Sequence, residues 1–141
     1  MLPRLAWLLC LVGTLIVFPT WPPAVSGDGA QGKGKPKAAL RVNPALIFVP
    51  QRIVATAELT GGADDFQDYY CPKIEWIWDD TTTSESTEDC AAYKPGTSTI
   101  RRRYTADHTY KDPGNYDVVF RMKQGSKIVL SLRQTVRAQG H

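Results

Sequence analysis

Carboxylates gather in three short segments near the middle of the chain, and their chemistry suits metal binding. The segments hold Asp64, Asp65 and Asp68, then Asp79 and Asp80, and then Glu85, Glu88 and Asp89. A hard cation such as calcium takes about six to eight oxygen ligands from loops that can wrap around it. No spacing here matches an EF-hand loop, so acids solvated in turns remain the alternative to a calcium cofactor. The candidate calcium ligands are Asp64, Asp65, Asp68, Asp79 and Asp80.

Arginines are frequent in the second half of the chain, although the whole sequence carries a formal net charge of only +3. Odd-numbered residues of an extended segment share one side, so neighbouring strands would place these arginines on the solvent face of one sheet. Such a face predicts weak, salt-sensitive binding to an acidic polysaccharide or protein. Alternatively, the charges only prevent edge-to-edge sheet pairing. The predicted basic face consists of Arg101, Arg103, Arg121, Arg133 and Arg137.

The sequence shows no pattern of residues that is typical of an enzyme active site. His108 is the only histidine between residues 41 and 138, and no serine or cysteine lies in a recognisable nucleophile motif. A pair of carboxylates that cleaves a glycosidic bond needs a cleft, which a domain of roughly a hundred residues seldom builds. We therefore expect a protein that is not an enzyme and has no catalytic residues.

Two cysteines, Cys71 and Cys90, remain if the first 26 residues are removed. An exported chain with one pair of thiols normally oxidises them, so we expect a disulfide between these two residues. It would close a loop of about twenty residues and stabilise the fold by roughly 3 kcal/mol in the chain-entropy model. A zinc site lacks ligands, and the Cys-x-x-Cys spacing of a redox pair is absent.

The first residues are typical of an export signal. Arg4 supplies a positive charge, residues 5–18 form an apolar run, and residues 24–26 form a small-residue cleavage site. The run is shorter than the ~20 residues of a spanning helix, so we expect a signal peptide over 1–26 and no membrane span after its cleavage. Retention as an anchor is the alternative. The protein is then expected to be secreted, periplasmic or at the cell surface, with no nucleic-acid partner.

The rest of the chain is expected to form a flexible leader and one domain. Residues 27–37 contain no apolar residue larger than alanine, so they cannot bury enough surface to offset their ordering entropy. We therefore assign a Gly/Lys-rich leader to 27–40 and a single domain to 41–138.

Extended runs without periodic helix patterns predict that the domain is an all-β antiparallel sandwich of about seven strands. Residues 46–49 would form the first strand, which Pro50 closes. In the next strand, Ala55 and Ala57 point inward and leave room for a bulky side chain, for which Trp76 is the expected occupant.

Two blocks of sequence carry a family resemblance. Residues 74–82 read Ile-Glu-Trp-Ile-Trp-Asp-Asp-Thr-Thr, and residues 108–120 read His-Thr-Tyr-Lys-Asp-Pro-Gly-Asn-Tyr-Asp-Val-Val-Phe. In order and spacing they resemble two motifs of polycystic kidney disease (PKD) domains, namely aromatic-x-Trp-x-aromatic-Gly-Asp-Gly-Thr and His-Thr-Tyr followed by Pro-Gly-x-Tyr-x-Val. Asp80 matches the aspartate of the first motif, whereas Asp79 and Thr81 stand where the family has glycines.

The resemblance implies an immunoglobulin-like β-sandwich that serves as a binding or spacer module. The expected function is a non-catalytic exported module for carbohydrate or protein binding, or adhesion, at the cell envelope. Alternatives are a structural envelope protein that assembles with another protein and, more remotely, an enzyme accessory domain. Carbohydrate binding would use exposed aromatics on a sheet face, for which Tyr69, Tyr70 and Tyr93 are candidates. The structural motif residues would be Trp76, Trp78, His108, Tyr110, Gly114 and, as a corner tyrosine, Tyr116.

Overall fold

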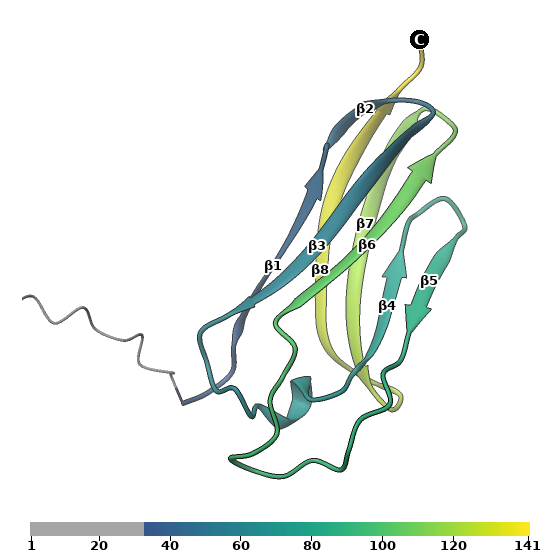
Figure 1. The fold of residues 1–141 in the computed structure, drawn as a ribbon. Helices are drawn as coiled ribbons and strands as arrows, with labels where there is room; N and C mark the ends of the chain where they lie inside the picture. Colours follow the sequence, from purple (N-terminus) through teal and green to yellow (C-terminus); the bar gives the residue numbers. More distant parts are fainter. Residues whose placement is uncertain (1–32) are drawn as a thin grey trace, which may run out of the picture.

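Eight strands and one short 3-10 helix form residues 33–141, the part of the chain that the computed structural model describes (Figure 1). The expected signal peptide over 1–26 lies outside these residues. No α-helix occurs in the described part, so the all-β prediction is confirmed. The elements are β1 (Lys37–Asn43), β2 (Leu46–Phe48), β3 (Gln51–Thr60), η1 (Gln67–Tyr69), β4 (Lys73–Ile77), β5 (Thr83–Ser86), β6 (Arg103–Tyr110), β7 (Gly114–Gln124) and β8 (Lys127–Gln139).

The strands form two sheets that lie one over the other (Figure 1). One sheet has three strands in the order β1-β3-β6, and the other has five in the order β2-β8-β7-β4-β5. Neighbouring strands are antiparallel except β2 and β8, which are parallel. Buried side chains from both sheets make one core, so the arrangement is that of a sandwich.

The sheet begins earlier in the chain than the sequence predicted. Strand β1 starts at Lys37, so residues 37–40 belong to the three-stranded sheet rather than to the leader assigned to 27–40. Ala38, Leu40 and Val42 pack against the core, while Ala39 and Arg41 between them are exposed. Its apolar residues are small or medium in size and include the outward Ala39, so the alternation of this strand is weak in the sequence.

Two of the inward residues of β3 are small, as the sequence predicted. Ala55 and Ala57 are fully buried in the same core as Trp76 and Trp78, whose indoles are also buried. This supports the expected pairing of small residues on one sheet with bulky residues on the other. Val119 of β7 lies between the inward Val118 and Phe120 along the strand, and yet it is also only 8% exposed. Its register partners on the neighbouring strands are Ile77 of β4 and Arg133 of β8.

Three aromatic rings form a column that joins the two sheets. The indoles of Trp76 and Trp78 stack with centroids 5.8 Å apart, and the His108 imidazole stacks on Trp78 at 4.7 Å. The tryptophans come from β4 and its end in the five-stranded sheet, whereas His108 lies in β6 of the three-stranded sheet. The Tyr110 hydroxyl, also in β6, donates a 2.7 Å hydrogen bond to the Trp78 carbonyl oxygen. These contacts fix how the sheets face one another.

Trp76→Ala should lower the free energy of unfolding by ~3 to 5 kcal/mol, because it removes a buried indole from this column. Phe48→Ala is the matched control, since Phe48 is an aromatic residue that is 48% exposed. It should cost less than about 1 kcal/mol. Urea unfolding followed by circular dichroism measures both changes, and equal losses would contradict the packing described above.

The turn from β4 into β5 has backbone angles that glycine adopts most readily. Asp79 has φ of 66° and Thr81 has φ of 71°. Both values lie in the left-handed region, where a β-branched residue such as threonine is strained. The PKD motif that residues 74–82 resemble has glycine at these two positions. Asp80, between them, accepts hydrogen bonds from the backbone N–H and the hydroxyl of Thr82, which hold the turn.

Thr81→Gly should therefore raise the free energy of unfolding by about 0.5 to 1 kcal/mol, because glycine removes the left-handed strain at a small entropic cost. Thr83→Gly, two residues on in strand β5, should lower the same quantity, since a strand interior gains nothing from glycine. Thermal unfolding of both variants measures the difference. A Thr81→Gly protein less stable than wild type would refute the strain at this position.

Candidate functional site

The predicted basic face is divided between the two sheets, so that expectation is corrected. Arg103 lies in β6 of the three-stranded sheet, and Arg101 lies in the segment just before it. Arg121, Arg133 and Arg137 lie in β7 and β8 of the five-stranded sheet. The solvent faces of two packed sheets point in opposite directions, so these arginines cannot form one surface. The five arginine side chains are exposed or half-buried, as predicted, but alternation within a strand does not show which strands share a sheet.

Four of the five arginines are also paired with carboxylates, which reduces the positive potential of each face. On the five-stranded sheet, Glu75 of β4 accepts from Lys123 at 2.9 Å and from Arg121 at 3.5 Å. The hydrogen bond from Lys123 and both positive charges hold the pKa of Glu75 below its usual value, despite the opposing effect of burial. The other pairs are Arg101 with Glu88, Arg103 with Glu58, and Arg133 with Asp117.

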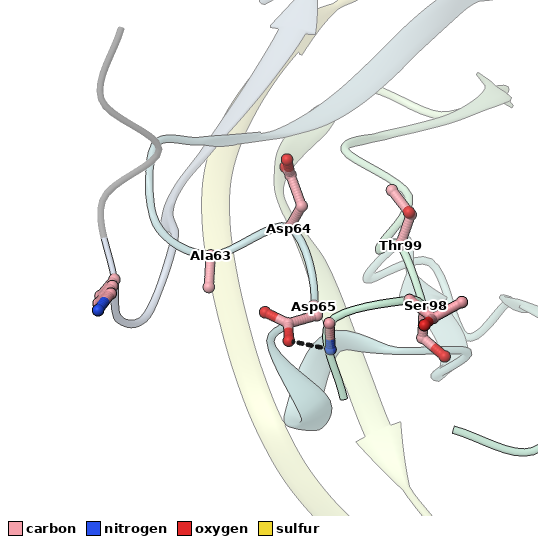
Figure 2. A pocket seen from close by; sticks show the side chains of 8 residues that line it. Ala63, Asp64, Asp65, Ser98 and Thr99 are labelled. Atoms are coloured by element: carbon pink, nitrogen blue, oxygen red, sulfur yellow. Dashed lines mark hydrogen bonds between the residues drawn. The ribbon is translucent and has the colours of Figure 1, made fainter. Parts of the chain in front are cut away.

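The candidate calcium ligands do not converge either. Asp64, Asp65 and Asp68 precede strand β4, whereas Asp79 and Asp80 follow it, so the two groups lie at opposite ends of that strand. Figure 2 shows the carboxylates of Asp64 and Asp65 pointing in different directions. Residues 33–141 contain no group of three or more histidine, cysteine or acidic side chains placed to hold a metal ion. The predicted set of five ligands is therefore corrected.

Asp64 and Asp65 instead connect two loops. One of the Asp64 carboxylate oxygens accepts from the Arg102 guanidinium at 2.5 and 3.1 Å, and the Asp64 carbonyl accepts from the Ile100 N–H at 2.7 Å. The Asp65 carboxylate accepts from the Gly96 N–H at 2.7 Å, the bond drawn in Figure 2. These bonds hold the loop over 61–72 against the loop over 87–102.

Asp80 and His108 form a pair at the other end of the molecule. His108 Nε2 lies 2.7 Å from an Asp80 carboxylate oxygen, so residues 74–82 and residues 108–120 meet here. Burial alone would raise the pKa of Asp80, but the hydrogen bonds from Thr82 and His108 outweigh it and lower that pKa. Both residues line a depression of about 320 Å³ that Tyr116 also borders. The Tyr116 hydroxyl donates to the Asp112 carbonyl oxygen at 2.8 Å, as a corner tyrosine does.

The lowered pKa of Asp80 predicts a pH dependence of stability. A carboxylate whose pKa is depressed by folding stabilises the native state above its unfolded pKa, and this contribution is lost as the pH falls through the folded value. The stability advantage of wild type over Asp80→Asn should therefore shrink as the pH drops from about 5 to about 2. Thr82→Ala, which removes one of the lowering hydrogen bonds, should give a shallower dependence than wild type. Urea unfolding at a series of pH values measures this, and parallel profiles for all three proteins would contradict it.

The disulfide between Cys71 and Cys90 is present, as the sequence predicted. It joins the end of the loop over 61–72 to the loop over 87–102, and Figure 1 shows both loops at the same end of the sheets. The disulfide thereby holds the residues next to Cys71 close to the residues next to Cys90. The Tyr70 hydroxyl donates to the Ala91 carbonyl oxygen at 2.9 Å, directly beside it.

Two tyrosines meet next to this disulfide and form the strongest candidate for a binding site. The rings of Tyr70 and Tyr93 are half-buried, with centroids 5.5 Å apart and planes inclined by 58°. The Tyr93 hydroxyl donates to the Asp65 carbonyl oxygen at 2.6 Å, so hydrogen bonds to the backbone orient both rings. Tyr70 and Tyr93 line a depression of about 240 Å³ together with Gln67, Asp68 and Gln124.

The side chains around the two rings offer hydrogen-bonding groups. Gln124, the last residue of β7, donates to the carbonyl oxygens of Asp68 and Tyr70 at 3.2 and 2.6 Å. A second depression of about 370 Å³ lies beside Asp65 and is lined by Thr97, Ser98 and Thr99, the last two of which Figure 2 labels. Tyr93 connects the two depressions through its bond to Asp65. We call these two depressions, with their lining residues, the loop-end site.

Only part of the loop-end site could be expected from the sequence. Tyr70 and Tyr93 were among the predicted exposed aromatics, but they lie in loops rather than on a sheet face. Tyr69, the third candidate, is fully buried in the core, so that expectation is corrected. Gln124 was missed because it is 54 residues from Tyr70 in the chain, and no local pattern marks that contact.

No protein-family model matches the chain, and no curated protein is significantly similar to it. Within residues 33–141, no helix has the length and apolar character needed to cross a membrane.

Proposed function

We propose that this protein is a non-catalytic exported module that binds carbohydrate through the loop-end site. The observation that carries the proposal is the pair of fixed, half-buried tyrosine rings, Tyr70 and Tyr93, beside amide, carboxylate and hydroxyl groups. Sugars present apolar C–H faces and polar rims, so an aromatic ring next to hydrogen-bonding side chains complements both. The disulfide keeps the two rings together in the absence of ligand, which lowers the ordering cost of binding.

The arrangement of strands supports an immunoglobulin-like, PKD-like fold. In an immunoglobulin-like sandwich the first, second and fifth strands share one sheet, while the third, sixth and seventh share the other. The order β1-β3-β6 corresponds to the first group, and β4, β7 and β8 correspond to the second. The stacking of Trp78 on His108, and the left-handed angles at Asp79 and Thr81, also agree with the two PKD motifs.

The geometry around His108 favours binding over catalysis. A nucleophile activated by histidine would place its hydroxyl against an imidazole nitrogen. Here the nearby Thr82 hydroxyl donates to Asp80 instead, and the imidazole is held between Trp78 and Tyr110. These contacts suit a structural role for the histidine.

Binding to immobilised neutral and acidic polysaccharides tests the proposal. Tyr70→Ala and Tyr93→Ala should each weaken binding by roughly tenfold, because each removes one stacking surface. Phe48→Ala, which removes an exposed aromatic from strand β2, is the matched control and should bind as wild type does. Circular dichroism of each variant confirms that it is folded.

Equal binding by wild type and both tyrosine variants would remove the loop-end site from the proposal. If the folded wild type binds none of the polysaccharides, the carbohydrate class is wrong. A structural envelope protein that assembles with another protein would then be the better description, and cross-linking in envelope extracts would identify that protein.

A further inference from the structure

Strand β6 leaves a long open edge on the three-stranded sheet. It is the outer strand in the order β1-β3-β6, and no strand within residues 33–141 pairs with its other side (Figure 1). The other outer strands are better protected. Strand β1 lies beside β8 of the second sheet, β2 has three residues between Pro44 and Pro50, and β5 has four residues. An open strand of eight residues is a template for pairing with another strand.

The backbone groups on this edge belong to the odd-numbered residues. Near the end of β3, the Leu59 N–H donates to the Arg102 carbonyl oxygen at 2.8 Å. The next pair in the register of β3 and β6 is Glu58 with Arg103. Hydrogen-bonded pairs alternate along an antiparallel ladder, so the even-numbered residues of β6 bond to β3. The odd-numbered residues then direct their N–H and C=O groups outward. In agreement, the Arg103 carbonyl oxygen accepts a hydrogen bond from its neighbour Arg101 at 2.8 Å.

We propose that two copies of this chain associate through their β6 strands, which pair antiparallel about a two-fold axis. In the register with Thr105 opposite Thr105 of the second copy, Arg103 lies opposite Asp107 of the second copy, and the reverse pair follows from the symmetry. The side chains of these three residues are exposed and share one face of the strand. Opposite charges and paired threonines are both favourable neighbours across strands. Shifting the register of the two β6 strands in either direction would remove both Arg103–Asp107 pairs.

Charge complementarity is the reason to prefer a second copy as the partner. Within each copy, Arg103 is paired with Glu58 and Asp107 with Arg52, both from β3. In the dimer, Arg103 would lie between Glu58 of its own chain and Asp107 of the second copy, so each Arg103 has a negative neighbour on both sides. The edge is therefore complementary to itself. When the dimer forms, the hydrogen bond from the Arg101 side chain to the Arg103 carbonyl oxygen must break. The ion pair between the Arg101 guanidinium and Glu88 remains.

Sedimentation equilibrium of the purified chain over a range of concentrations tests this proposal. Wild type should show a reversible monomer–dimer equilibrium. In Arg103→Asp, an aspartate at position 103 of one copy lies opposite Asp107 of the other. In Asp107→Arg, two arginines lie opposite each other at the same positions. Each variant should therefore dimerise at least tenfold more weakly than wild type. An equimolar mixture of the two variants restores opposite charges at both pairs, and it should form a heterodimer with an affinity close to that of wild type.

Thr105→Pro provides a second, backbone-directed variant. The Thr105 N–H points outward, so proline removes no hydrogen bond within the monomer but blocks the dimer ladder. The variant should be folded by circular dichroism and monomeric, while Thr105→Val should still dimerise. The proposal is overturned if wild type remains monomeric at the highest concentration reached. It is also overturned if a dimer forms that neither the charge variants nor Thr105→Pro weakens, or if the mixture fails to associate.

Discussion

The contact between Trp78 and His108 is the constraint on which the arrangement of the two sheets depends. The indole extends from the end of β4, the imidazole extends from β6, and the two rings lie nearly parallel, with 10° between their planes. Asp80 holds the histidine from one side, and the Tyr110 hydroxyl holds the Trp78 backbone from the other. A packed aromatic column cannot slide without opening voids, so it fixes the distance and angle between the sheets. The left-handed turn at Asp79 and Thr81 is the local conformation that brings Asp80 to the histidine.

The opposite end of the molecule is organised by covalent and polar contacts between loops. The disulfide, the Arg102–Asp64 pair and the bonds to Asp65 join two loops that lie far apart in the sequence. Loops with so many cross-connections can position side chains nearly as precisely as strands do. This explains why Tyr70 and Tyr93 meet at a defined angle, and why the loop-end site is the best candidate for binding.

On the sheet surfaces, charged side chains pair with opposite charges on adjacent strands. Most basic side chains of the strands face a carboxylate on the adjacent strand, as Arg121 and Lys123 face Glu75. Exposed pairs of this kind contribute little to stability, but they specify register and partners. The pairing of Arg103 and Asp107 with β3 leaves both side chains at an open edge, where the same pattern of alternating charge can continue into another chain.

The sequence by itself determined the local features of this protein. Alternation predicted the inward Ala55 and Ala57 of β3 and the burial of Trp76 opposite them, the two cysteines predicted their disulfide, and the residues at positions 74–82 and 108–120 marked the elements that meet through Asp80 and His108. These features depend on the period of a strand and on the chemistry of single residues, both of which a sequence displays. The tertiary structure alone decided which strands share a sheet, and this separated Arg103 from Arg121 and Asp64 from Asp80. It also decided the contact of Gln124 with Tyr70 and the burial of Tyr69, because contacts between distant segments depend on how whole sheets pack and leave no trace in the local pattern.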